Sequence, residues 1–464
     1  MSILRLAPHL TATLALALPL TGSHLARQAI GVTDTLMVGW YGVDPLAAVV
    51  LATSFFFILF MLGSGFGIGV MGVIATAMAQ GDETEVRRAT RMALWLSAIH
   101  AVVVLPLMWF SGAVLLWLGQ TPEIAGYAQE YLRIMCWAMA PALWGLTLNS
   151  FLAALGRANI VLVITMAGIP LNMLLNWMLI FGHFGAPELG VAGSALASLA
   201  VNIFQLVLLV ICAIRLPEAQ RFHLFRRFWN PDWAAFRSIL MLGLPVGLTL
   251  VAESGMFVGT NVMMGWLGSH YLAAHGIALQ MASIAFMIHL GLSNAVTIRV
   301  GTFAGQKDRF GMREAGVTAI LLSILFAAVT ITIFLTLSRQ IAALYLDVND
   351  PLTPSIIALV GGLMVYAAMF QLADGMQVIA LGMLRGVQDT RIPMVLAVIS
   401  YWLIGLPTGW ALAFHGGWGA GGLWLGLLAG LFCAAILLMV RFWRGLATGR
   451  YGAGPLPAGR ANLG

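Results

Sequence analysis

"LPLTGSHLARQAIGVTDTLMVGWYGVDPLAA", residues 18–48, and "LPVGLTLVAESGMFVGTNVMMGWLGSHYLAA", residues 244–274, are two versions of one segment. They align without a gap at an offset of 226 residues. The residues that stay in register are Pro19 with Pro245, Gly39 and Trp40 with Gly265 and Trp266, and Leu46, Ala47 and Ala48 with Leu272, Ala273 and Ala274. Chance similarity between apolar helices would not keep Pro, Gly and Trp aligned. The match therefore indicates that the chain consists of two related halves.

Both halves have the composition of a membrane protein. Of the 464 residues, 61% are hydrophobic and 9% are charged, whereas about a quarter of the residues in a soluble domain are charged. A helix that crosses a bilayer needs about 20 mostly apolar residues. The predicted spans are 10–40, 45–78, 90–115, 130–154, 160–182, 190–214, 237–266, 270–300, 315–339, 354–384, 391–414 and 420–442. The predicted fold class is therefore an all-α integral membrane protein with about twelve transmembrane helices.

The repeat sets the expected domain organisation. Six spans per half give both halves the same orientation, so the repeat is parallel about an axis along the membrane normal. We expect an N-terminal six-helix lobe (1–214), a cytoplasmic linker (215–236), a C-terminal six-helix lobe (237–445) and a cytoplasmic tail (446–464). Two lobes around a central cleft that rock to give alternating access are the default for such a repeat. The run at 10–40 resembles a signal peptide, but its counterpart lies mid-chain, so we expect it to be a spanning helix.

The charges indicate how the helices are oriented. The even-numbered connections and the two ends of the chain hold nearly all the basic residues, including Arg87, Arg157, Arg221, Lys307 and Arg385. The odd-numbered connections hold acids such as Asp44, Glu123 and Asp347. By the positive-inside rule both termini and the even-numbered connections are cytoplasmic. The net charge of +6 therefore reflects topology, and it gives no reason to expect a nucleic-acid partner.

Three acids lie well inside predicted spans: Asp34, Glu253 and Asp374. An ionised side chain at the bilayer centre costs about 2.5–3.5 kcal/mol on insertion scales. Each acid must therefore be protonated, paired, bound to an ion or in contact with water, and a cation-coupled transporter needs carboxylates that change between such states. The alternative is a structural ion pair. Arg27 is the strongest candidate partner, because it lies two helical turns before Asp34 on roughly the same face.

Several amides inside the spans are candidates to line a cavity. Asn172 and Asn176 are spaced i, i+4 and share one helix face. They form either a polar rung beside Asp34 or interhelical hydrogen bonds worth about 1 kcal/mol in membranes, and the sequence leaves both readings open. The corresponding candidates for the second half are Gln280, Gln371 and Gln377.

The motifs of common membrane enzymes and pumps are missing from the sequence. There is no Walker motif, no serine-nucleophile elbow and no HExxH, and the three cysteines lie apart without metal or disulfide spacing. We therefore expect no enzymatic activity and no cofactor. A channel is a weaker alternative, because two lobes with differently placed carboxylates suit alternating access better.

Longer motifs resemble one family over nearly the whole chain. They are "VTDTLMVG" with Asp34, "GIPLNMLLNWMLIFGHFGAPELGVAG" with Asn172 and Asn176, "LPVGLTLVAESGMF" with Glu253, "HGIALQMASIAFMIHLGLSNAVTIRVG", and "FQLADGMQVIALGMLRGVQDTRIPM" with Asp374. The sequence resembles the multidrug and toxic compound extrusion (MATE) transporters of the bacterial NorM type. All three acids are present, which is typical of that type.

The resemblance implies an antiporter that exports amphipathic, mainly cationic compounds, driven by inward movement of H⁺ or Na⁺. It implies that Glu253 and Asp374 form the second-half cation site, holding the metal ion if the coupling ion is Na⁺, and that Asp34 serves the first half.

The sequence departs from the family at three places. At the first, Gly276 follows His275 where members commonly have a glutamine, so one expected polar contact of the cavity is missing. The other two bear on the coupling ion. Phe370 stands where some members have a tyrosine that helps to bind Na⁺, and Arg27 stands where a neutral amide is more usual. Both departures favour protons over Na⁺.

The expected setting follows from the same resemblance. We expect a monomer in the bacterial inner membrane, with organic cations and membrane lipids as its partners. A lipid-linked oligosaccharide flippase of the same superfamily is the alternative function. Its anionic cargo would call for several arginines in the cavity, whereas well inside these spans the three acids face one arginine, Arg27.

The predicted topology has a direct test. In a background without the three native cysteines, a single cysteine at Asn349 and another at Arg221 should be labelled from opposite sides of the membrane, because positive-inside places only Arg221 in the cytoplasm. The measurement is labelling of intact cells by an impermeant maleimide, before and after permeabilisation. Labelling of both positions from one side would contradict the topology.

Overall fold

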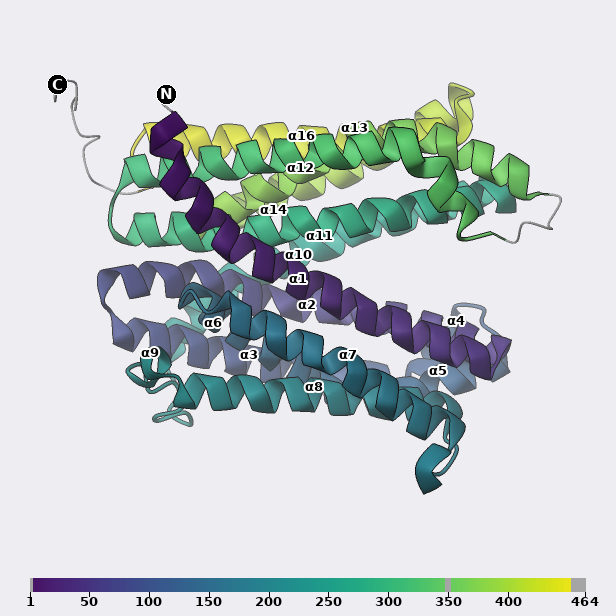
Figure 1. The fold of residues 1–464 in the computed structure, drawn as a ribbon, viewed down its shortest axis with the longest axis horizontal. Helices are drawn as coiled ribbons and strands as arrows, with labels where there is room; N and C mark the ends of the chain where they lie inside the picture. The colour runs from purple at the N-terminus through teal and green to yellow at the C-terminus, as the bar shows by residue number, and fades with distance from the viewer. Residues whose placement is uncertain (1–2, 347–351, 452–464) are drawn as a thin grey trace. The chain divides into compact units, whose positions relative to one another are not determined.

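A computed structural model describes residues 3–346 and 352–451, and this part of the chain is helical and contains no strand (Figure 1). The helices of the first half are α1 (Ile3–Tyr41), α2 (Val43–Gln80), α3 (Glu83–Trp109), α4 (Ser111–Trp117), α5 (Pro122–Met135), η1 (Cys136–Ala138), α6 (Met139–Ala154), α7 (Ala158–Phe181), η2 (His183–Gly185) and α8 (Gly190–Arg215). The later helices are α9 (Pro217–Gln220), α10 (Trp233–Leu267), α11 (Ser269–Gly305), α12 (Arg309–Ala343), α13 (Thr353–Gly386), α14 (Arg391–Val398), η3 (Ile399–Gly405), α15 (Leu406–Trp410), η4 (Ala411–His415) and α16 (Gly419–Ala447).

These helices confirm the predicted fold class. Within the described residues, eleven helical stretches are long and apolar enough to cross a membrane, with Pro122–Ala154 and Arg391–His415 each counted as one stretch. Helix α1, which has 39 residues, is not among them; its second half contains the polar residues Arg27, Gln28 and Asp34. With α1, the order of helices matches the twelve predicted spans.

The described chain forms two compact units. The first-half unit is Gly22–Leu248, and the second-half unit is Met1–Thr21 together with Thr249–Gly464. Both divisions fall inside helices, α1 and α10, at almost equivalent positions of the repeat. This differs from the predicted lobes, whose boundary lay in the linker at 215–236. Of the predicted tail, residues 452–464 lie outside the described residues, as do Asp347 and Asn349.

Specific contacts explain why α1 and α10 are each divided between units. Arg299 on α11 donates to the backbone oxygen of His9 at 2.5 Å and also bonds the Thr13 hydroxyl, which joins the beginning of α1 to the second-half unit. In the first-half unit, α10 approaches α2 at Gly243. A Cβ there would lie 2.8 Å from the Cα of Phe66, so only glycine permits this approach.

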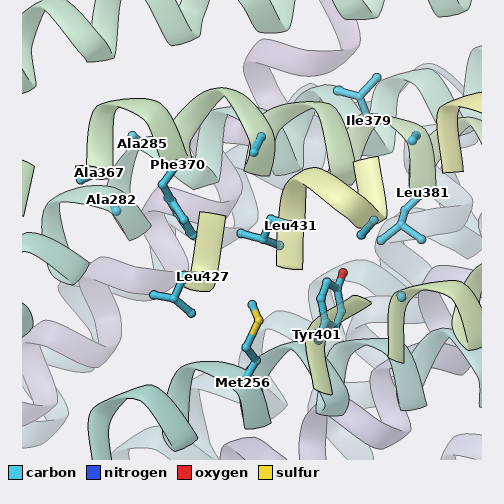
Figure 2. Packing of buried hydrophobic residues seen from close by; sticks show 14 of the residues in the cluster. Met256, Ala282, Ala285, Ala367, Phe370, Ile379, Leu381, Tyr401, Leu427 and Leu431 are labelled. Atoms are coloured by element: carbon cyan, nitrogen blue, oxygen red, sulfur yellow. The ribbon is translucent and has the colours of Figure 1, made fainter. Parts of the chain in front are cut away.

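Inside each unit the long helices pack around a small number of central ones. Helix α13 packs against α11, α12 and α16 in the second-half unit, and α2 packs against α3 and α6 in the first-half unit (Figure 1). Figure 2 shows the second-half core, where Met256 of α10, Phe370 of α13, Leu427 of α16 and Tyr401 of η3 lie close together. The core therefore joins the helices that carry Glu253 and Asp374.

The predicted span at 391–414 contains two π-helical segments, η3 and η4. In these segments the backbone N–H donates to the oxygen five residues earlier, one residue further than in an α-helix. The N–H of Leu406 donates to the Tyr401 oxygen, and that of Gly416 donates to the Ala411 oxygen. Pro407 lies just after η3 and has no N–H to donate into the ladder. The first change of register thus lies directly beside this proline, and π-helical turns often occur at functional sites.

The linker at 215–236 is folded against the first-half unit. The Trp95 indole donates to the Phe228 oxygen at 3.0 Å, and Arg91 donates to the Arg227 oxygen at 2.8 Å. Asp232 accepts two bonds from Arg88, at 2.5 and 3.2 Å, and one from the backbone N–H of Ala235 at 3.1 Å, which caps α10. The bonds from Arg88 are the main reason that the pKa of Asp232 is lowered.

Asp232→Ala should lower the free energy of unfolding by about 1–2 kcal/mol, because it removes a helix cap and one of the two carboxylate partners of Arg88. The lowered pKa means that this stabilisation is present at neutral pH and is lost as the pH falls below about 4. Thermal unfolding of the purified protein in detergent measures the change.

The matched control is Glu218→Ala, which removes the other linker carboxylate and its bond to Arg157. Both side chains of that pair are more than 40% exposed, so the unfolding midpoint should stay within error of the wild type. Equal losses in the two variants would show that Asp232 acts only as a surface charge.

Candidate functional site

The first-half unit surrounds Asp34 with neutral donors. Asn172 and Asn176 of α7 donate to its Oδ1 at 2.8 and 2.7 Å, and Ser198 of α8 donates to Oδ2 at 2.6 Å. Asp34 is 8% exposed, and both asparagines are fully buried. Three donors compensate a carboxylate for lost hydration without neutralising its charge. The group can therefore still take up a proton or another cation.

Arg27 does not pair with Asp34. No ion pair joins them in the described part of the chain, and every hydrogen-bond partner of Asp34 is neutral. Arg27 is half-buried, and it acts electrostatically on His24 one turn earlier. The structural ion pair considered from the sequence is thus not formed. Neither Ser198 nor its contact with Asp34 was predicted, because serine is common in membrane helices and its spacing on α8 shows no pattern.

The second-half unit brings Glu253 of α10 near Asp374 of α13. Their exposed fractions are 9% and 3%, and the two carboxylates interact electrostatically. No hydrogen bond to Asp374 Oδ1 is formed within residues 3–346 and 352–451, and the same holds for both amide atoms of Gln371 and for the side-chain oxygen of Gln377. Buried polar atoms without partners are uncommon and call for an explanation. Three of these atoms are oxygens that can accept a hydrogen bond or bind a cation.

Arg385 lies close to Glu253, and we call Glu253, Asp374 and Arg385 the second-half cluster. The sequence had instead placed Arg385 in a cytoplasmic connection. It lies in the last turn of α13, is 4% exposed and interacts electrostatically with Glu253. The sequence spacing could have predicted this position, because Arg385 follows Asp374 by eleven residues, which is three helical turns and places both on one helix face. It was missed because apolar runs locate a span more reliably than its ends.

Tyr401 and Trp402, consecutive residues of the π-helical segment η3, form hydrogen bonds with α13 and α10, the helices that carry Asp374 and Glu253. Gln377, on the turn after Asp374, donates to the Tyr401 hydroxyl at 2.5 Å. The Trp402 indole donates at 3.0 Å to the backbone oxygen of Ala252, the residue before Glu253. Tyr401 is fully buried and interacts electrostatically with both carboxylates and Arg385. Neither residue was predicted, since aromatic residues in an apolar span usually indicate packing alone.

The other predicted site residues are placed differently. Phe370 packs edge-on against the rings of Phe257 and Trp424, with centroids 6.0 and 5.6 Å away, so it is a core residue one turn before Asp374. Gln280 is half-buried on α11, and no hydrogen bond joins it to Glu253 or Asp374. No group of three or more His, Cys, Asp or Glu side chains in the described residues is arranged to hold a metal ion.

Known proteins resemble the chain over nearly its full length. A protein of Rhizobium meliloti (strain 1021) named "Probable multidrug resistance protein NorM" is 46% identical over 436 residues, which are 94% of this chain and 93% of the relative. "Multidrug resistance protein NorM" of Burkholderia vietnamiensis is 37% identical over 445 residues, 94% of each chain. These relatives agree with the resemblance found in the sequence.

Solved structures share the fold. One reported as "Outward-facing conformation of a multidrug resistance MATE family transporter of the MOP superfamily" has a TM-score of 0.86 at 19% identity, covering 95% of this chain and 96% of the other. A MATE P26A mutant has a TM-score of 0.85 at 19% identity, covering 95% and 97%. At this identity the likeness concerns the fold alone.

The family model MatE matches residues 19–178 and 245–411. The two matches begin at Pro19 and Pro245, the prolines that the internal repeat aligns, so each half corresponds to one copy of the family's unit. Together with the relatives, these matches cover most of the chain and show that it belongs to the MatE family, whose members are transporters and not enzymes.

Proposed function

We propose that this protein is a multidrug efflux antiporter that exchanges inward H⁺ or Na⁺ for amphipathic, mainly cationic compounds. The observation that carries the proposal is the buried pair of Glu253 and Asp374 with unpaired oxygens around it. The relatives named as multidrug resistance proteins support the substrate class. The protein acts as a monomer in the bacterial inner membrane, with both termini cytoplasmic, and needs only its coupling ion and no cofactor.

The charges of the second-half cluster suit the exchange of one cation. Two ionised carboxylates in a low-dielectric environment repel each other strongly. Arg385 contributes one positive charge near Glu253, so the three groups carry a net charge of about −1 when both acids are ionised. One proton or one monovalent cation neutralises that charge. A bound coupling ion and a cationic compound therefore compete, and competition of this kind couples their movements.

The first-half site has a different part in the cycle. All the hydrogen-bond donors around Asp34 are neutral, so when the carboxylate is ionised no ion pair offsets its charge and it attracts cations. We assign to it the binding of a cationic compound or a second proton, through Asn172, Asn176 and Ser198.

The coupling ion is more readily a proton than Na⁺. Sodium is a hard cation and requires several oxygen ligands. Phe370 has no hydroxyl to offer, and its ring is engaged with Phe257 and Trp424. A proton needs only one carboxylate oxygen, and Asp374 Oδ1 is without a hydrogen-bond partner in the described residues.

Cells that express the protein should accumulate several-fold less ethidium than control cells, because acidic sites in an apolar helical protein favour cationic amphipaths. The measurement is dye fluorescence in energised cells, followed by dye transport in liposomes with an imposed pH or Na⁺ gradient. Unchanged dye retention, together with transport of an anionic lipid, would instead favour a flippase.

Glu253→Gln and Asp374→Asn should each reduce gradient-driven dye transport about tenfold or more. Both substitutions remove the charge that exchanges cations while preserving the shape of the side chain. Because the carboxylates act as one unit, the double variant should be little worse than either single variant. Asp34→Asn should also impair transport.

The matched control is Glu314→Gln, which changes a buried acid on α12 whose partner is Arg313. It should keep near wild-type transport and the same level of protein in the membrane. If both second-half variants still move dye uphill at wild-type rates, coupling occurs elsewhere, and Asp34 is the next residue to test.

A further inference from the structure

The linker between the halves (215–236) and the next residue, Arg237 of α10, carry positive charge that the acids of this segment do not offset; the whole segment 215–237 is called the linker below. Its two carboxylates are Glu218 and Asp232, and each is paired with an arginine from outside the linker, Arg157 and Arg88 respectively. The linker itself holds five arginines: Arg215, Arg221, Arg226, Arg227 and Arg237. None of the five forms an ion pair in the described part of the chain, and all five are exposed.

Two large aromatic side chains lie on the same segment. Trp229 is 78% exposed and Trp233 is 73% exposed. Tryptophan has an apolar ring system and a polar N–H, so it prefers the level of the lipid headgroups at a membrane surface. An aqueous loop would leave these rings in water at a considerable cost in free energy.

The linker is held in a defined shape. Trp95 donates to the Phe228 oxygen at 3.0 Å and stacks on the Phe228 ring, with the centroids 5.8 Å apart. Trp229 meets Trp95 edge-on at 5.6 Å, and Arg91 donates to the Arg227 oxygen at 2.8 Å. A ligand that binds this surface therefore has little loop entropy to remove, which favours affinity.

Membrane geometry identifies the partner. The linker joins α8 and α10, which are both long and apolar enough to cross a membrane, so we expect their ends at Arg215 and Trp233 to lie at a membrane surface. Phospholipid phosphates lie at that level, and an arginine fork can hold a phosphate with two parallel bonds. A segment that combines exposed arginines with tryptophan is suited to contact both the phosphate and the adjoining acyl region.

We infer that the linker, residues 215–237, is a binding surface for the headgroups of anionic phospholipids. Arg226, Arg227 and Arg237 bind the phosphates, and Trp229 and Trp233 rest in the interfacial region. This assignment requires neither the proposed cargo nor the proposed coupling ion.

The test uses the purified full chain in a neutral detergent, titrated with phosphatidylglycerol or phosphatidylcholine, with bound lipid counted by native mass spectrometry. Wild-type protein should bind phosphatidylglycerol at least tenfold more tightly than phosphatidylcholine. The triple variant R226Q/R227Q/R237Q should lose most of that preference and bind phosphatidylcholine as before. Thermal unfolding without added lipid checks that the variants are folded, and no change is expected there because these side chains are exposed.

The matched control removes three exposed arginines from the second half, as R391Q/R444Q/R450Q, and should retain the preference. Trp233→Ala should weaken phosphatidylglycerol binding several-fold with no change in charge, which would support lipid over a free anion. Three results would overturn the inference: an unchanged preference in the linker variant, an equal loss in the control variant, or displacement of the lipid by millimolar inorganic phosphate with no effect of Trp233→Ala.

Discussion

A carboxylate buried among membrane-spanning helices has lost its water, and the protein must replace it. The cost of an uncompensated charge at that depth is several kcal/mol, so the arrangement of polar groups around each buried acid is under strong constraint. This structure meets the constraint in two ways. Asp34 is surrounded by neutral donors. Glu253 and Asp374 instead interact electrostatically with each other, and Arg385 and Tyr401 belong to the same group of interacting side chains.

The two halves have kept their helices but have diverged at the acids. In the gapless alignment, Glu253 of the second half corresponds to Arg27 of the first, and Asp34 corresponds to Thr260. Thr260 donates to a backbone oxygen of its own helix, that of Met256, and carries no charge. The duplication therefore supplied two copies of one helical scaffold, and substitutions at equivalent positions gave the copies different electrostatics. Such asymmetry is useful to a transporter, because two unlike sites can hold unlike cations.

Backbone irregularity supports the second-half site. Pro407 lacks an amide hydrogen, and the preceding turns adopt π-helical bonding. This places Tyr401 and Trp402 so that they bond to the two helices carrying the acids. Gly405 lies at the same point, where a Cβ on Gly430 of α16 would come within 3.0 Å of its Cα. A helix with regular bonds would present these side chains at different angles, so the irregular segment helps to hold α10 and α13, the helices that carry the two acids.

The linear pattern of residues was enough to predict the twelve helices, the duplication, the family and the three buried acids, because all of these are local or periodic. Apolar runs of fixed length, a repeated register of Pro, Gly and Trp, and isolated charges in apolar segments can be read without knowing which helices touch. The contacts between helices could not be read in this way. That Ser198 bonds Asp34, that Arg27 does not pair with it, and that Arg385 and Tyr401 join Glu253 all depend on side-chain directions across helices distant in sequence. The division of α1 and α10 between the two units also arises from packing, since an uninterrupted helix carries no local mark of where its neighbours change.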